Sequence, residues 1–295
     1  MFNTRIKLNL PSTITRSSLA QRNWQKFMSN KLALVGLTIV IVFVSGSILA
    51  PLISAYDPSY IDPTIRYLPP STEHWLGTDS LGRDVMTRLL YGGGMSIFVG
   101  VTSAICASAI GVVLGCIAGY LGGKKDSAIL YVSEIFMAFP QILIVIIMVG
   151  FTGRGILNLI LIFSFTGWMG CMRIVRGKVL SLKEESFVES CRANGIGSMS
   201  IMFRHLLPNT FGPIIVNVTL GTAIYILQEA ALSFLGIGLD PSIPTWGNMI
   251  NAARSLEIIQ NYPNLWLAPG FAICLLVLGI NFFGDGLRDV FDPKQ

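Results

Sequence analysis

Long apolar runs interrupt this chain at six places, and they restrict its fold more than any other feature of the sequence. The hydrocarbon core of a bilayer is about 30 Å thick, and an α-helix needs roughly 20 apolar residues to cross it. Only 13% of the 295 residues are charged, against about 25% in an ordinary soluble domain. The sequence therefore predicts an all-α membrane protein with six transmembrane helices.

We expect the spans at residues 32–53, 95–120, 128–150, 156–172, 211–236 and 265–284, within a transmembrane domain over 32–284. Residues 1–31 would form a cytoplasmic N-terminal segment and residues 285–295 a cytoplasmic tail. Because the basic stretch before the first run is too long for a signal peptide, that run is expected to remain as an anchor. Pro140 is expected to kink the third span.

Lysine and arginine are distributed unevenly between the segments that join these spans. If the N-terminus is inside, 16 of the 21 basic residues lie in inner segments and 5 in outer ones. Inner loops of membrane proteins carry the excess of Lys and Arg. The distribution therefore predicts an N-in, C-in topology, and it accounts for the net charge of +5 without nucleic acid.

A hydrophilic loop over residues 173–209 separates the fourth span from the fifth. Its Ser-Leu-Lys-Glu sequence at 181–184 fits a capping box. A helix is then expected to run to Asn194, with Gly195 as the residue just past its end.

A second short helix is expected to begin at Ser198 and to be stopped by Pro208. Its apolar residues follow helical spacing: Met199, Met202, Phe203 and Leu206. Two short helices with an apolar stripe and basic flanks would make a compact knob at the membrane surface. Such a knob can dock into a groove on a soluble partner.

At these residues the chain resembles the EAA loop of ABC importer permeases. The family pattern is E-A-A, three residues, G, nine residues, I-x-L-P. Four residues stand at positions that the pattern specifies: Glu189, Gly195, Leu207 and Pro208. Three residues depart from it: Ser190 and Cys191 at the alanines, and His205 at the isoleucine. The His-Leu-Leu-Pro-Asn form resembles the dipeptide, oligopeptide and nickel branch of these permeases.

Further segments resemble motifs of the same branch. They are HWLGTDSLGRD at residues 74–84, EAALSFLGIG at 229–238, PTWGNM at 244–249 and GDGLRD at 284–289. Their order along the chain matches that of the branch, so the resemblance extends over most of the sequence.

The resemblance implies a type I ABC importer of the bacterial inner membrane. A second homologous permease would complete the pathway, two ATP-binding cassette ATPase subunits would hold ATP and Mg, and an extracytoplasmic substrate-binding protein would deliver the cargo. The chain itself would bind no cofactor and catalyse no reaction. The residues implied in coupling to the ATPases are Glu185, Glu189, Ser190, Cys191, Gly195, His205, Leu207 and Pro208.

Dipeptides or oligopeptides are the expected cargo, with nickel or a metal chelate as the alternative. A secondary transporter is a further alternative, since composition and span number fit it equally well. A membrane enzyme is not favoured, because neither His74 nor His205 lies within an expected span and no phosphate-binding loop is present.

One carboxylate inside an expected span and one cluster of charged residues are candidate sites. Glu229 lies inside the fifth expected span, where an ionised carboxylate costs ~3 kcal/mol or more unless it is partnered. It could line the pathway or pair with a neighbouring helix. Asp79, Arg83 and Asp84 lie in an outer segment, and they could face the receptor or hold an internal turn by ion pairs.

Small residues recur every four positions in the second expected span: Ala107, Gly111, Gly115 and Gly119. Such a stripe lets helix backbones approach closely in lipid. A packing face inside this subunit is favoured over a face for a partner subunit. Trp75, Trp246 and Trp266 are expected in the aromatic belt at the outer interface, and residues 18–31 as an amphipathic helix on the inner surface.

Overall fold

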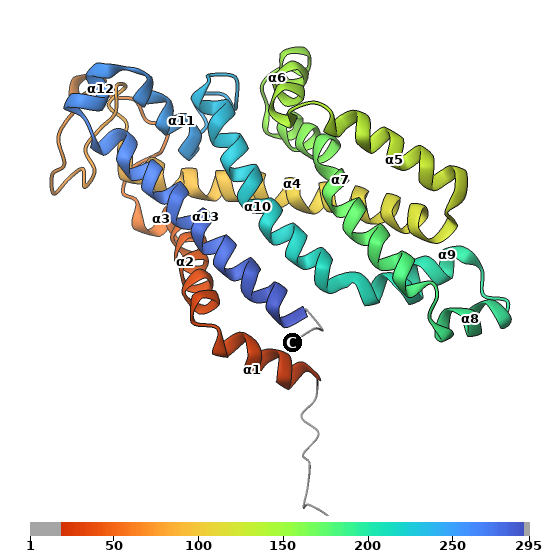
Figure 1. Ribbon diagram of the computed structural model, residues 1–295. Helices are drawn as coiled ribbons and strands as arrows, with labels where there is room; N and C mark the ends of the chain where they lie inside the picture. Colours follow the sequence, from red (N-terminus) through yellow and green to blue (C-terminus); the bar gives the residue numbers. More distant parts are fainter. Residues whose placement is uncertain (1–18, 292–295) are drawn as a thin grey trace, which may run out of the picture.

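The structure is a computed structural model that describes residues 19–291. In this part of the chain the regular structure is helical, apart from one isolated β-bridge between Thr78 and Asp84. The long helices are α2 (Lys31–Ile48), α4 (Val85–Leu121), α7 (Ile156–Leu182), α10 (Phe211–Phe234) and α13 (Asn264–Phe291). Figure 1 shows α7, α10 and α13 slanting in the same direction, with α4 passing across them.

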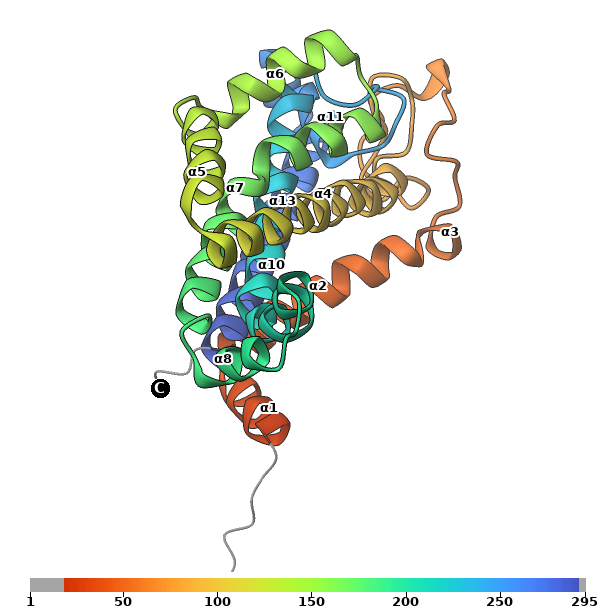
Figure 2. The same cartoon turned by 90° about the vertical axis from the view of Figure 1, so that its right-hand side faces the viewer.

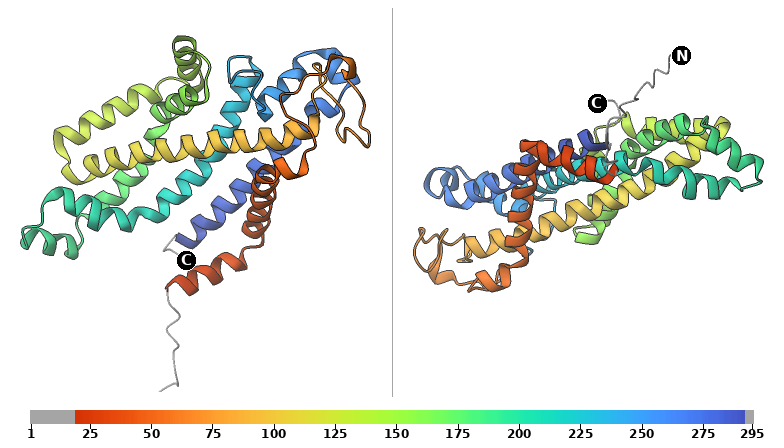
Figure 3. Two further views of the ribbon diagram at one scale, coloured as in Figure 1. Left: turned by 180° about the vertical axis from the view of Figure 1, so that it is seen from behind. Right: turned by 90° about the horizontal axis from the view of Figure 1, so that it is seen from below.

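The short helices lie at the ends of the long ones. They are α1 (Leu19–Ser29), α3 (Ala50–Ile53), α5 (Gly123–Met137), α6 (Gln141–Thr152), α8 (Ser186–Ala193), α9 (Ser198–Ser200), α11 (Trp246–Ile250) and α12 (Leu256–Asn261). In Figure 3, α8 and α9 lie at the opposite end of the molecule from α11 and α12.

Five helices are long and apolar enough to cross a membrane, and the bent pair α5–α6 makes six if it is one span. The third expected span is not a single kinked helix. It consists of two helices, α5 and α6, which are bent by 85° relative to each other. Pro140 has no backbone N–H and disfavours helical geometry at Phe139, so α5 ends and a separate helix begins at Gln141. Figure 2 shows the corner where the two helices meet.

Several helices are longer than the expected spans. Helix α4 begins at residue 85 instead of 95, α7 ends at 182 instead of 172, and α13 reaches 291 instead of 284. The bilayer limits the apolar length of a helix but not its helical length. The predicted loop over 173–209 is therefore wrong at its start, because its first ten residues are the last turns of α7.

Helix α4 packs along α7 through the predicted stripe of small residues. A Cβ added at Gly111, Gly115 or Gly119 would lie 2.6, 2.7 or 2.9 Å from a carbonyl oxygen of α7. Those oxygens belong to Trp168, Met172 and Arg176. The stripe is therefore a packing face inside the subunit, as favoured.

Trp246 does not lie in an aromatic belt, and that prediction is wrong. Its side chain is 1% exposed, its indole N–H donates to the Leu89 carbonyl at 2.8 Å, and its ring meets Phe43 edge to face at 5.4 Å. Trp75 is exposed and Trp266 half-buried. Helix α1 forms inside the expected amphipathic segment, whose residue 18 lies outside the described part.

Candidate functional site

The hydrophilic segment after α7 folds into a knob, which we define as residues 183–210. The predicted capping box at residues 181–184 is wrong, because Ser181 still belongs to α7. Glu185 occupies the N-cap position of α8 and makes no side-chain capping hydrogen bond. Helix α8 therefore begins after a turn, with Val188 as its only buried side chain.

Gly195 reverses the chain after α8, as predicted. Its φ is +74°, in the left-handed region that favours glycine. Its N–H donates to the Arg192 carbonyl at 2.9 Å, and the N–H of Ile196 donates to the Cys191 carbonyl at 3.1 Å. This pair of bonds is the Schellman arrangement, which satisfies the last carbonyls of a helix.

The second helix of the knob does not end at Pro208. After α9 the chain passes through a π-helical turn (Ile201–Leu206) and a 3-10 turn (Leu207–Thr210) directly into α10. In the wider π-helical turn the Leu207 N–H donates to the Met202 carbonyl. Pro208 follows in the first turn of the 3-10 segment, where its lack of a backbone N–H leaves no helical hydrogen bond unmade. Ser198 begins α9, but it makes no cap and Gly197 occupies the N-cap position.

The apolar stripe of the knob faces inward, so it is not the surface that a docking partner would meet. Met202 and Leu206 are buried with Val188, Val175 and Val179 in one hydrophobic cluster. Of the four stripe residues only Met199 is exposed, with 65% of its surface accessible. The stripe therefore holds the knob onto α4 and α7.

The exposed surface of the knob is mostly polar. Of the residues implied in coupling, five are exposed: Glu185, Glu189, Ser190, Gly195 and Pro208. Three are half-buried: Cys191, His205 and Leu207. Arg192 lies over the ring of Tyr120 at 5.3 Å, so a cation–π contact ties α8 to the end of α4. The knob therefore presents a mostly polar exposed surface over a buried apolar core.

At the opposite end of the molecule, Asp79 organises the turn before α4. Its carboxylate accepts from Arg83 Nε at 2.7 Å and from the backbone N–H groups of Leu81 and Arg83 at 2.8 and 3.1 Å. Arg88 Nε lies 3.9 Å from the same carboxylate. These contacts are all internal to the outer segment and the first turn of α4.

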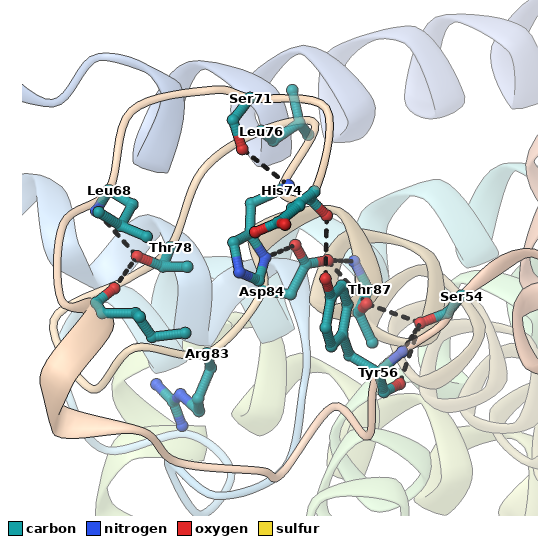
Figure 4. Close-up of polar contacts among 12 residues, drawn as sticks. Ser54, Tyr56, Leu68, Ser71, His74, Leu76, Thr78, Arg83, Asp84 and Thr87 are labelled. Atoms are coloured by element: carbon teal, nitrogen blue, oxygen red, sulfur yellow. Dashed lines mark hydrogen bonds and ion pairs between the residues drawn. The ribbon is translucent and has the colours of Figure 1, made fainter.

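Asp84 caps α4, and Figure 4 shows the side chains that surround it. Its carboxylate accepts from the Thr87 N–H and hydroxyl, both at 2.7 Å, and pairs with His74 Nδ1 at 2.9 Å. Tyr56 stacks on the His74 ring at 4.8 Å. Both members of the His74–Asp84 pair are buried, so the geometry matches the internal-turn alternative.

Glu229 on α10 is fully buried, with 0% exposure. Its carboxylate accepts hydrogen bonds from Ser233 at 2.8 Å and from Ser96 of α4 at 3.2 Å. The Ser96 hydroxyl in turn accepts from the backbone N–H of Trp246 at 3.3 Å. The side chain is placed as the helix-pairing alternative describes, joining α4, α10 and α11.

Sequence reasoning missed Arg88, which is 2% exposed and donates to the Pro58 carbonyl at 3.0 Å. Its position four residues after Asp84 could have predicted that Arg88 faces the charged turn before α4. Sequence reasoning also assigned nothing to neutral polar side chains within the apolar spans. Between residues 19 and 291 no group of three or more His, Cys, Asp or Glu could hold a metal ion.

Residues 111–295 match the family described as binding-protein-dependent transport system inner membrane component. Residues 18–70 match the N-terminal TM domain of oligopeptide transport permease C. The chain is 42% identical to the dipeptide transport system permease protein DppC of Alkalihalophilus pseudofirmus, over 92% of this chain and 89% of that protein. It is 39% identical to the oligopeptide transport system permease protein OppC of Bacillus subtilis, over 91% and 88%.

A third relative has a different cargo in its name. The glutathione transport system permease protein GsiD of Pectobacterium atrosepticum is 37% identical, over 92% of this chain and 90% of that protein.

Proposed function

Because the chain belongs to the family of binding-protein-dependent transport system inner membrane components, we propose that it couples ATP hydrolysis on partner subunits to peptide import. It is a multi-pass protein of the bacterial inner membrane and a permease subunit of a peptide ABC importer. Two of the three relatives are named as dipeptide and oligopeptide permeases and the third as a glutathione permease, which does not favour the nickel alternative.

The partners follow from the family. A second homologous permease would complete the pathway, and two ATPase subunits would bind ATP and Mg against the inner face. A substrate-binding protein would deliver the peptide from outside. In this arrangement the chain itself performs no catalysis, and its contribution is the conformational change of its spans.

The continuity of the knob with two long helices supports its coupling role most directly. Helix α7 enters the knob at Leu182, and the 3-10 turn (Leu207–Thr210) leads from it into α10 without a break. The buried Val188, Met202 and Leu206 fix the knob to these helices. A displacement of the knob by an ATPase would therefore move α7 and α10 as rigid bodies.

The charged residues at the outer end have a supporting role in this proposal. Asp79, Arg83 and Asp84 hold the turn that starts α4, and Glu229 joins three helices. They would keep the outer part of the subunit rigid while the knob moves, without themselves contacting the receptor or the cargo.

Co-purification from native membranes tests the proposal. A second permease and an ATPase should be recovered with this chain, and proteoliposomes containing the complex and its binding protein should import labelled dipeptide only with ATP. Recovery of the chain alone, importing peptide without ATP, would instead indicate a secondary transporter.

Gly195→Val tests the coupling role of the knob. A β-branched residue in the left-handed region costs about 1–2 kcal/mol, so the Schellman turn should open and ATP-driven uptake should fall about tenfold. Gly197→Val is the matched control, because Gly197 has a φ of −67° and, like Gly195, open space at its Cβ position. Both chains should insert into the membrane, and equal uptake by the two variants would contradict the coupling role.

A further inference from the structure

A cavity of about 510 Å³ lies between the α5–α6 corner, α4, α7 and α10. Its volume is in the range of sites that hold small molecules. Apolar and glycine residues make most of its wall, among them Phe136, Met169 and Gly170. Neutral polar side chains also reach it, and they come from three of its walls: Ser108, Gln141, Asn217 and Tyr225.

Tyr225 is the polar group best placed to receive a ligand. Its side chain is 5% exposed and stacks on Phe163 with ring centroids 5.2 Å apart. The hydroxyl lies against Gly167, where an added Cβ would overlap it. Tyr225 borders the cavity, and a phenolic hydroxyl can both donate and accept a hydrogen bond. The hydroxyl is therefore a polar group that a ligand in the cavity could bind.

The other polar groups offer both donors and acceptors. Ser108 donates to Asn217 Oδ1 at 3.3 Å, which leaves the Asn217 amide N–H groups and the Ser108 lone pairs available. Gln141, directly after the helix break, donates to Thr166 at 3.3 Å and accepts from Gln228 at 3.1 Å. The Gln228 Oε1 atom is buried without a partner in the described chain.

The cavity carries no formal charge. Among the described residues that line it there is no Asp, Glu, Lys, Arg, His or Cys. A divalent cation would find none of the carboxylate, imidazole or thiolate ligands that metals prefer. A peptide main chain, by contrast, presents neutral N–H donors and carbonyl acceptors, and the polar groups of this cavity match them.

We propose that this cavity binds the main-chain amides of the peptide cargo within the membrane, through Tyr225, Asn217, Ser108 and Gln141. The inference rests on the proposed function and adds the site and its chemistry. Since neutral groups contact the main chain, the cavity accepts cargo without selecting the charge of its side chains. Exposed Met137, Phe139 and Ile224 border the opening of the cavity, and the second permease covers it from there.

Asn217→Asp tests the site, because an aspartate can still accept from Ser108 while adding one negative charge. The complete importer, reconstituted with its ATPases, partner permease and binding protein, is supplied with two labelled dipeptides that carry an Asp or a Lys side chain. Asn217→Asp should shift the ratio of their import rates toward the Lys peptide by about tenfold. Asn261→Asp makes the same chemical change in an exposed residue of α12 outside the cavity and should leave the wild-type ratio.

The binding protein is the same in each experiment, so a changed ratio reports on the permease. If the wild-type complex imports neither peptide, the proposed function fails. If it imports both and Asn217→Asp keeps the wild-type ratio, the assignment of the cavity fails while the function stands.

Gly170→Leu is a second variant that does not depend on charge. An added Cβ at Gly170 meets no atom within 4 Å, so the new side chain should fill the cavity without disturbing the fold. Import of both peptides should fall at least about tenfold with an unchanged unfolding temperature. Gly270→Leu on α13 is the control, because its Cβ position is also open and lies away from the cavity. Wild-type import by Gly170→Leu would overturn the proposal.

Discussion

At the scale of single residues, Glu229 illustrates how a buried carboxylate is kept in an apolar span. Its two serine partners stand at very different distances along the chain: Ser233 is one turn away on α10, whereas Ser96 lies on α4. The bond between Ser96 and the Trp246 backbone extends the network to α11. The carboxylate thus satisfies one hydroxyl on α10 and one on α4, and removing it leaves both hydroxyls without their acceptor.

Glu229→Ala should destabilise the subunit by about 3 kcal/mol, because it leaves a cavity and two buried hydroxyls without their acceptor. Glu229→Gln keeps the volume and one acceptor, so its effect should be much smaller. The unfolding temperature of the purified complex in detergent measures both. Equal unfolding temperatures for wild type and Glu229→Ala would show that the network contributes nothing to stability.

At the scale of elements, the close contact between α4 and α7 depends on three glycines of α4, Gly111, Gly115 and Gly119. Their spacing of four residues matches the spacing of the carbonyl oxygens of Trp168, Met172 and Arg176 on α7. The backbones approach so closely that a side chain larger than hydrogen has no room. This contact sets one wall of the cavity and carries the knob at its inner end.

Gly115→Leu should separate α4 from α7 and destabilise the chain by about 3 kcal/mol or more. An added Cβ would lie 2.7 Å from the Met172 carbonyl oxygen and 2.9 Å from Val175 Cβ, and a helix backbone cannot move aside locally. Purified yield and unfolding temperature should both fall. Gly270→Leu, whose Cβ position is open, should retain both, and a similar loss in the two variants would contradict the packing argument.

At the scale of the whole molecule, the two ends differ in construction. The inner end carries the knob, whose surface is exposed and whose core is shared with α4 and α7. The outer end is a folded cap made of residues 54–84, α11 and α12 (Figure 3). Within it Trp246 is buried in one cluster with Met249 and Ile258, and His74 pairs with Asp84. The distribution of Lys and Arg predicts that the knob lies in the cytoplasm.

Single cysteines test this orientation in a chain whose five native cysteines are replaced by alanine. Glu257→Cys lies in an exposed turn of α12 and Ser190→Cys on the exposed face of α8. A membrane-impermeant thiol reagent added to spheroplasts should label Glu257→Cys alone, and both variants after the membrane is dissolved. Labelling of Ser190→Cys in intact spheroplasts would reverse the topology.

The all-α membrane fold could be predicted from local patterns, because lipid requires long apolar helices. The span bounds and the orientation stay predictions. Apolar length locates a span, and the placement of Lys and Arg orients it. Gly195 and the stripe on α4 were also predictable, since a left-handed turn and a close helix contact each require glycine. The motifs resembling the peptide permease branch identified the family before any contact was known.

Other features depended on which residues the folded chain brings together. Pro140 signals a bend but not its 85° angle, which depends on where α6 packs. The helical spacing of Met202 and Leu206 defined a stripe, yet only the position of α7 shows that it faces inward. Likewise Ser108, Gln141, Asn217 and Tyr225 are isolated polar residues in the sequence, and they become one cavity because three helices and a corner converge on it. Whether a side chain is buried, and which residues it contacts, depends on the packing of segments far apart in the sequence. The local sequence pattern does not specify that packing.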